Sequence, residues 1–247
     1  MPYTAGEIRA RVLHRDADVL ILDKPHGLSV HYGTKTVEHL EQYLPWVAFE
    51  REEPPRLAHR LDKDTSGCLV LARDAEVAAR LGRLFLHGHV GKTYWAVVLG
   101  RPPGEAGRID LPLLKVQIPG CSKVVVDPDG KPALTDWRLL ATDGRLSWLE
   151  LTPRTGRMHQ LRAHCACSGF PILGDPIYGA EQPPPVPLHL HARSVSFRLG
   201  AADSPPVAAT APPPRHMAAT LARIAGEAAP APGCYDGDRT ALSETAL

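Results

Sequence analysis

Short runs in which apolar positions are continuous or alternate with polar ones recur along the chain. Such runs over residues 19–22, 68–72, 92–99, 146–152 and 188–199 predict strands, since turn-forming residues follow or precede each of them. The run over residues 68–72 is entirely apolar, which predicts a strand buried on both faces. The pattern therefore predicts several short strands separated by tight connections.

Two segments instead have the spacing of an amphipathic helix. Asp74 is a suitable N-cap for a helix that places Val77 and Leu81 on its apolar side and stops near Gly88. Residues 158–168 show a similar spacing, and Gly169 is placed to end that helix. Many strands, few helices and antiparallel-type turns favour an α+β domain.

Two further segments carry specific expectations. Residues 127–130, Asp-Pro-Asp-Gly, have the composition of a hairpin loop and predict that residues 124–126 pair with residues 133–140. Beyond Gly200 the chain becomes rich in Ala and Pro, which predicts a linker over residues 201–215, a short helix over 217–225 and disorder from about residue 228. We therefore expect a domain over residues 1–200 and a partly disordered extension over residues 201–247.

Composition narrows the class of protein. A chain of 247 residues that is 44% hydrophobic can bury a sizeable core, and none of its apolar stretches is long enough to span a bilayer. The net charge of +1 means that a nucleic-acid surface would have to be a local patch. Five cysteines without the spacing of a disulfide framework suit a reducing compartment, so we expect a cytoplasmic protein without membrane contact.

Candidate chemistry gathers in three polar clusters beside predicted strands, at residues 59–67, 92–94 and 154–164. Taken alone, the first could be an ordinary turn, and the third could be a solvated basic face or a phosphate site at a helix start. A metal site is not expected, because Cys165 and Cys167 with His159 and His164 match no common zinc spacing. Cys165 is instead predicted to be a buried small hydrophobe.

Together, these clusters resemble the signature motifs of the RluA-type RNA pseudouridine synthases. The matching segments are His59-Arg60-Leu61-Asp62 with Thr65-Ser66-Gly67, Lys92-Thr93-Tyr94, the stretch from Arg154 to His164, Pro171-Ile172-Leu173-Gly174-Asp175, Asp23-Lys24-Pro25 with Gly27, and Leu188-His189-Leu190-His191-Ala192. Several motifs agree in order and spacing over about residues 19–197. A lone Arg-Leu-Asp would mean little.

The resemblance implies a fold and an activity. The fold would be a mixed, largely antiparallel sheet in two halves, with a central active-site cleft and helices packed on one side. The activity would be isomerisation of uridine in RNA to pseudouridine, in which the bond from C1′ to N1 is cut and the base is rejoined through C5. The reaction gains or loses no electrons, which agrees with a sequence that has no dinucleotide or P-loop motif, and no cofactor is implied.

Three residues match the catalytic positions of that family. Asp62 corresponds to its aspartate, which could attack C1′, attack C6 of the uracil, or remove a sugar proton. Arg162 corresponds to the arginine that pairs with this aspartate and offsets the cost of holding a carboxylate in a partly dry pocket. Tyr94 corresponds to the tyrosine that lies against the uracil ring and is a candidate base for the C5 proton.

The partner implied is RNA, either transfer RNA or ribosomal RNA or both, bound by a monomer. The expected RNA contacts are Arg60, Lys63, Thr65, Arg80, Arg83, Lys92, Arg154, Arg157 and His159. Many relatives carry a small RNA-binding domain before the catalytic one, and the strand at residues 19–22 begins too early to leave room for it. Two alternatives stay open: an RNA-binding protein of the same fold without catalysis, and a nucleoside or glycoside hydrolase that uses Asp62 with a second carboxylate such as Asp64.

Overall fold

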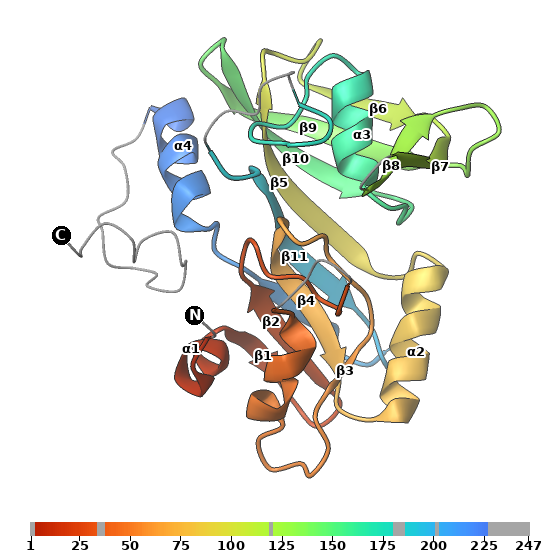
Figure 1. Cartoon of the computed structure of the whole chain (residues 1–247), viewed down its shortest axis with the longest axis vertical. Coiled ribbons are helices and arrows are strands. Elements are labelled where there is room, and N and C mark those ends of the chain that lie inside the picture. The colour runs from red at the N-terminus through yellow and green to blue at the C-terminus, as the bar shows by residue number, and fades with distance from the viewer. Residues whose placement is uncertain (1–2, 34–37, 119–120, 180–185, 201–202, 227–247) are drawn as a thin grey trace. The chain divides into compact units, whose positions relative to one another are not determined.

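The structure is a computed structural model that describes residues 3–33, 38–118, 121–179, 186–200 and 203–226 (Figure 1). The described chain divides into two compact units. The first contains the described residues of Met1–Gly91 and Ala192–Arg215, and the second those of Lys92–His191 and His216–Pro230.

The first unit is built around a buried strand, β4. Its elements are α1 (Ala5–Ala10), β1 (Val12–Arg15), β2 (Val19–Lys24), the 3-10 helix η1 (Leu40–Val47), β3 (Arg56–Leu57), β4 (Ser66–Ala72), α2 (Ala75–Leu86) and β12 (Val207–Thr210). All seven residues of β4 are buried, and β2 pairs with it antiparallel from Val19 opposite Ala72 to Lys24 opposite Gly67. Helix α2 packs Val77 and Leu81 into the same core. The continuous apolar run at residues 68–72 is therefore a strand covered on both faces, as predicted.

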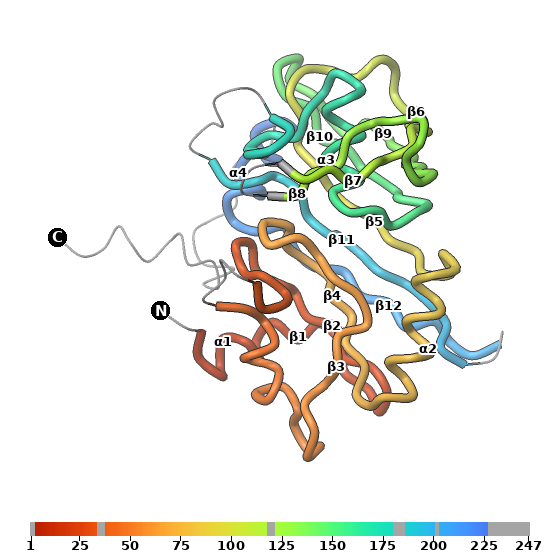
Figure 2. The backbone as a smooth tube through the Cα atoms, turned by 45° about the vertical axis from the view of Figure 1, so that its right-hand side comes forward, coloured from red at the N-terminus to blue at the C-terminus, as the bar shows by residue number. Residues whose placement is uncertain are grey.

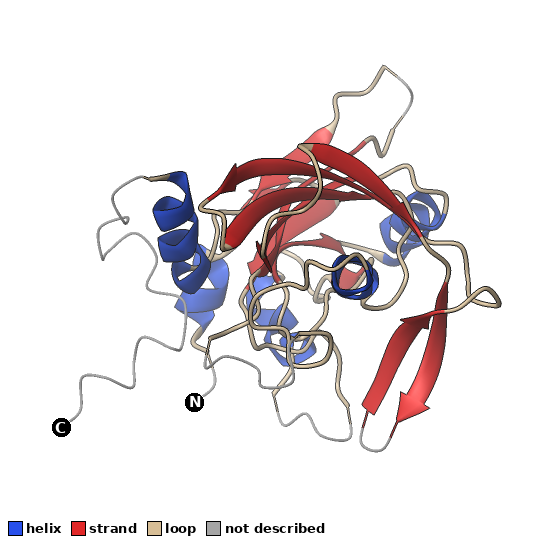
Figure 3. Cartoon of the chain, turned by 90° about the horizontal axis from the view of Figure 1, so that it is seen from above, coloured by secondary structure: helices blue, strands red, loops and turns tan. Residues whose placement is uncertain are grey.

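The second unit contains four neighbouring strands of the ten-stranded sheet and a separate hairpin. Its elements are β5 (Gly91–Leu99), β6 (Ala106–Asp110), β7 (Leu113–Ile118), β8 (Cys121–Val126), β9 (Leu134–Thr142), β10 (Leu146–Pro153), α3 (Gln160–Cys167) and most of α4 (Arg215–Ala225). These four strands have the order β5-β10-β9-β6, and β7 pairs with β8 in the hairpin seen at the lower right of Figure 3. Strand β11 (Leu190–Phe197) begins in this unit and ends in the first one.

The predicted helices are confirmed. Asp74 caps α2 by accepting a hydrogen bond from the Val77 N–H at 2.8 Å, and Gly88 follows the helix with φ 74°. Helix α3 begins at Gln160 and is followed by Gly169 with φ 87°. Together with antiparallel strands in both units, these helices confirm the α+β class.

The expected hairpin around residues 127–130 is wrong. Strand β8 pairs with β7, whereas β9 pairs with β6 and β10, so the Asp-Pro-Asp-Gly segment connects two different sheets. A Cβ atom at Gly130 would lie 2.5 Å from the carbonyl carbon of Leu113, so the glycine lets the turn pack directly onto β7. Turn composition indicates that the chain reverses there but does not identify the strand with which the next segment pairs.

The expected linker over residues 201–215 is also partly wrong, because it contains β12. This strand pairs antiparallel with β11 from Val207 opposite Phe197 to Thr210 opposite Ser194 (Figure 2). The short helix predicted over residues 217–225 is confirmed as α4, which packs Met217, Leu221 and Ile224 against apolar residues of the second unit. The disorder expected from about residue 228 lies outside the described residues.

Candidate active site

Asp62 occupies a tight turn that leads into β4. The Asp62 carbonyl accepts a hydrogen bond from the Thr65 N–H at 3.2 Å, which closes the turn. The next carbonyl, that of Lys63, accepts from Lys24 Nζ at 2.9 Å, and that of Asp64 is 2.7 Å from His26 Nδ1. Lys24 is at the end of β2 and His26 is in the loop after it. With the bond from Thr65, three consecutive carbonyls of the turn are held by donors.

Lys24 is fully buried and acts as a cross-link between two loops. Besides the Lys63 carbonyl, its ammonium group donates to the carbonyls of Pro25 and Leu28, both at 2.8 Å. An ammonium has three N–H donors, and three carbonyls accept them. Gly27 makes this arrangement possible, because its φ of 79° turns the chain back toward Lys24.

The protonation of Lys24 is set by competing effects. Burial lowers the pKa of its amine to about 7, while the negative charges of Asp64, Asp62 and Asp23 act in the opposite direction. The carboxylate of Asp62 is therefore one of the charges that favour the protonated form of Lys24.

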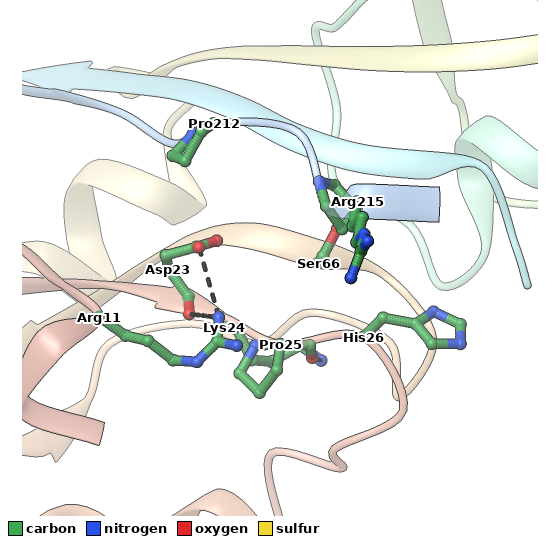
Figure 4. Close-up of a pocket in the computed structure, with 9 residues that line it drawn as sticks. Arg11, Asp23, Lys24, Pro25, His26, Ser66, Pro212 and Arg215 are labelled. Atoms are coloured by element: carbon green, nitrogen blue, oxygen red, sulfur yellow. Dashed lines mark hydrogen bonds and ion pairs between the residues drawn. The ribbon is translucent and has the colours of Figure 1, made fainter. Parts of the chain in front are cut away.

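A small cavity lies beside the end of β2, within the first unit. It has a volume of about 20 Å³, enough for one water molecule, and Lys24, Ser66 and Arg215 are among its lining residues (Figure 4). At its edge the buried Arg11 reaches both the carbonyl and the carboxylate of Asp23 at 3.4 Å. Charged side chains, among them Lys24, therefore line this cavity together with prolines.

Gly67 follows the turn, and its lack of a side chain lets the backbone of β11 pack closely against it. Its φ is 102°, and a Cβ atom there would lie 2.3 Å from the carbonyl oxygen of Ala192. Only glycine fits both the conformation and the close approach. This explains the glycine of the Thr65-Ser66-Gly67 motif.

In the second unit, Arg162 is buried on α3 and pairs with Asp175. Its Nε donates to one carboxylate oxygen of Asp175 at 2.7 Å and its Nη2 to the other at 2.9 Å. Burial acts to raise the pKa of Asp175, but the hydrogen bonds and charge of Arg162, with the N–H groups of Ile177 and Tyr178, hold it below its usual range. The guanidinium plane of Arg162 is thereby fixed in one orientation.

The turn before α3 is organised by Gln160. The Gln160 side-chain oxygen accepts from the Thr155 hydroxyl at 2.7 Å and from the Arg157 N–H at 3.0 Å. Its amide nitrogen donates to the Leu134 carbonyl and the Thr135 hydroxyl, both at 3.0 Å. His159 is the N-cap residue of α3 and has a left-handed φ of 50°. Its Nδ1 lies 3.0 Å from the Tyr178 hydroxyl.

Lys92 and Tyr94 lie near the start of β5. Tyr94 is half-buried opposite Leu151 and packs beside the main apolar core of the second unit. Lys92 is also half-buried, and burial lowers the pKa of its amine. The Lys92 amine lies beside Gly156, 4.0 Å from where a Cβ atom would stand.

The predicted site residues are divided between the two units. Asp62, Arg60, Lys63, Thr65, Arg80 and Arg83 belong to the first, and Lys92, Tyr94, Arg154, Arg157, His159 and Arg162 to the second. The pairing expected between Asp62 and Arg162 therefore stays a prediction.

The predicted RNA contacts differ in exposure. Arg60, Lys63, Arg83, Arg154 and Arg157 are exposed, whereas Thr65 is buried. Arg80 donates to the Leu199 carbonyl. Arg154 and Arg108 each contact the carboxylate of Asp136 at 2.7 Å. The third cluster is not simply a solvated basic face, because Gln160, Arg162 and His164 are buried.

Four residues of the site were not singled out by the sequence, namely Lys24, His26, Gln160 and Asp175. Lys24, Gln160 and Asp175 stand within the quoted motifs, which was a usable signal. His26 lies between Pro25 and Gly27 and carried none. Among the described residues, no group of three or more His, Cys, Asp or Glu side chains is arranged to hold a metal ion, and no helix is long and apolar enough to cross a membrane.

Comparison with known proteins identifies the family. Residues 18–167 match the model of the RNA pseudouridylate synthase family. An RNA pseudouridine synthase of Zymomonas mobilis is 42% identical over 208 residues, which cover 83% of this chain and 94% of that protein. The mitochondrial pseudouridylate synthase RPUSD4 of Xenopus tropicalis is 32% identical over 88% of this chain and 81% of its own length.

Solved structures of pseudouridylate synthases have a similar fold. The human RNA pseudouridylate synthase domain containing 4 superposes with a TM-score of 0.76 at 28% identity, covering 90% of this chain and 95% of that one. The human RNA pseudouridylate synthase domain containing 1 superposes with a TM-score of 0.70 at 25% identity, covering 87% of each chain. The fold and the polar site thus define an RNA-modifying isomerase. The chain belongs to the RNA pseudouridylate synthase family, whose reaction converts uridine in RNA to pseudouridine.

Proposed function

We propose that Asp62 is the carboxylate that acts on the target uridine. The observation that carries this assignment is the turn at residues 62–65, in which three consecutive carbonyls are held by Thr65, His26 and the buried Lys24. A group that must meet a reacting carbon needs a fixed position, and a turn anchored on a buried strand supplies one. The sequence match of residues 59–67 to the family motif points to the same side chain.

We propose further that Arg162 offsets the charge of the catalytic carboxylate and that Tyr94 accepts the proton that C5 loses. These roles rest on the motif match. The bidentate bond of Arg162 to Asp175 supports the first, because it fixes a buried guanidinium in one orientation. In the overall reaction the C1′–N1 bond breaks, a C1′–C5 bond forms, C5 loses its proton and N1 gains one.

The substrate is proposed to be transfer RNA, ribosomal RNA or both, bound by a monomer in the cytoplasm. The target base cannot react while stacked, so it must be extruded, at a cost of roughly a few kcal/mol when paired and less in a loop. Exposed cations, namely Arg60, Lys63, Arg83, Arg154 and Arg157, are proposed to offset part of that cost through phosphate contacts. His159, Thr65, Lys92 and Arg80 are less accessible and would act by shaping the loops around the RNA.

Tritium release tests the assignment of Asp62. RNA labelled with tritium at uracil C5 is incubated with the wild type, Asp62→Asn and Asp64→Asn. The wild type should release tritium without free uracil, Asp62→Asn should lose activity by several orders of magnitude, and Asp64→Asn, two residues away in the same turn, should keep most of it. Full activity in Asp62→Asn would overturn the assignment.

The same assay separates the alternatives. Free uracil would indicate hydrolysis of the glycosidic bond, and RNA binding without either product would indicate a binding protein. Mapping modified uridines in cells with and without the gene would identify the RNA.

A further inference from the structure

His26 is a donor to the Asp62 turn that the family motifs quoted above do not include. It stands between Pro25 and Gly27, at the end of the segment drawn in Figure 4, and its side chain is half-buried. Its Nδ1 lies 2.7 Å from the Asp64 carbonyl oxygen, 38 residues away in the sequence. Because a carbonyl oxygen can only accept, Nδ1 must carry the proton in this hydrogen bond.

The location of this bond gives it a mechanical role. The Asp62 turn has three successive carbonyls, and those of Lys63 and Asp64, in the two peptide bonds that flank Asp64, are held from the end of β2 and the loop after it. Lys24 holds the first of these, while His26 holds the second. Without His26, the carbonyl of the peptide between Asp64 and Thr65 would lose this bond, while its N–H would keep the 3.2 Å bond to the Asp62 carbonyl. The turn that carries the Asp62 side chain would then be held less firmly.

We propose that His26 is a positioning residue for Asp62. By donating from Nδ1 to the Asp64 carbonyl it fixes the turn that carries the catalytic carboxylate, and it takes no part in the chemistry. The inference rests on the proposed role of Asp62. Since the neutral Nδ1–H tautomer and the imidazolium both carry a proton at this nitrogen, the bond does not require a charged ring.

Two amide side chains distinguish this role from simple packing. The amide nitrogen of Asn can occupy the position of the His Nδ1, whereas that of Gln reaches the position of Nε2. The proposal therefore predicts that His26→Asn keeps the hydrogen bond to the Asp64 carbonyl and that His26→Gln and His26→Ala lose it. His31→Asn is a matched control, because His31 is exposed in the same unit and contacts Glu41 at 3.1 Å.

Single-turnover kinetics on tritium-labelled RNA, with enzyme in excess, measure the chemical step and the affinity separately. A displacement of about 1 Å can cost roughly a hundredfold in rate. His26→Ala and His26→Gln should therefore slow the chemical step about 10- to 100-fold, with the half-saturating enzyme concentration changed less than about twofold. His26→Asn should stay within about threefold of the wild type, and His31→Asn should match it.

The proposal is overturned if His26→Ala reacts at the wild-type rate, or if Asn and Gln are equally slow and lower the melting temperature equally. The first result would show that the bond is dispensable, and the second that His26 only packs. Asp62→Asn, measured in parallel, separates the two hypotheses. An active Asp62→Asn removes the proposed function itself, whereas an inactive Asp62→Asn with a fully active His26→Ala removes only the role of His26.

Discussion

Lys24 shows how one buried residue can couple charge to loop geometry. Its ammonium group is enclosed by three carbonyls, two from its own loop and one from the turn that holds Asp62. Replacement by methionine would keep much of the volume but leave all three acceptors without this donor. Since an unsatisfied buried polar group costs about 1–3 kcal/mol, Lys24→Met should clearly lower the free energy of unfolding.

The same lysine predicts a pH dependence. Its pKa is about 7 in the folded protein and 10.5 when unperturbed, so between these values the unfolded chain binds more protons. The free energy of unfolding contributed by Lys24 should therefore rise from about pH 7 to pH 10, by at most about 1.4 kcal/mol per pH unit. Urea denaturation of the wild type and Lys24→Met across this range measures the difference, and parallel curves would show that Lys24 keeps its proton.

Asp175 is a buried residue whose charged form, unlike that of Lys24, stabilises the fold. Asp175→Asn removes the charge that faces the buried Arg162, and breaking one partner of a buried pair costs about 3–5 kcal/mol. Because the pKa of Asp175 is lowered in the fold, its stabilisation is present above the usual carboxyl range and is lost as the pH falls through the folded pKa.

Denaturation curves test this expectation. The difference between the wild type and Asp175→Asn should be largest near pH 7 and shrink below about pH 4. Asp129→Asn, at an exposed turn position of the second unit, should have little effect at either pH.

At the scale of elements, α2 follows local rules that the sequence reveals. Asp74 caps its first turn, and substitution of an N-cap by alanine costs about 1 kcal/mol. Asp74→Ala should therefore lower the free energy of unfolding by about that amount, while Asp74→Ser, which retains a capping oxygen, should lose much less. Equal losses in the two variants would contradict the capping role of Asp74.

Local pattern did not determine which elements pair. The helix boundaries near Asp74 and Gly169 follow from capping and turn residues, which act over a few positions. Strand β8, in contrast, pairs with β7 rather than with β9, and β12 forms inside an Ala/Pro-rich segment because β11 offers it a partner. Such pairings depend on contacts that only the folded chain creates.

The site also combines features that local sequence pattern predicts with contacts between distant segments that it does not predict. Motif order marked Asp62, Tyr94 and Arg162 as candidates, but the carbonyl bonds of Lys24 and His26 and the Asp175 partner of Arg162 join segments 13 to 39 residues apart. No local pattern encodes those distances. The motifs could mark Lys24 and Asp175 as residues of interest, but the bonds by which they hold a candidate catalytic group were visible only in three dimensions.

For the whole molecule, the net charge of +1 means that RNA affinity must come from local cations. Arg83 is exposed on α2, whereas the neighbouring Arg80 donates to the Leu199 carbonyl. Arg83→Glu should weaken RNA binding several-fold and reduce its dependence on salt, with an unchanged melting temperature. Arg80→Glu should also lower the melting temperature.

Filter binding at several salt concentrations, with thermal unfolding of the same samples, makes this comparison. Unaltered affinity and salt dependence in Arg83→Glu would show that α2 does not contact RNA.

The path of the chain through the two units has a practical consequence. The polypeptide passes from one to the other after residues 91, 191 and 215, so each is assembled from separated stretches. No single proteolytic cut can release either one whole, and a gene shortened after residue 200 would strip β12 from one and α4 from the other. Anyone dissecting this enzyme into expressible halves would have to rewire its connections rather than trim its ends.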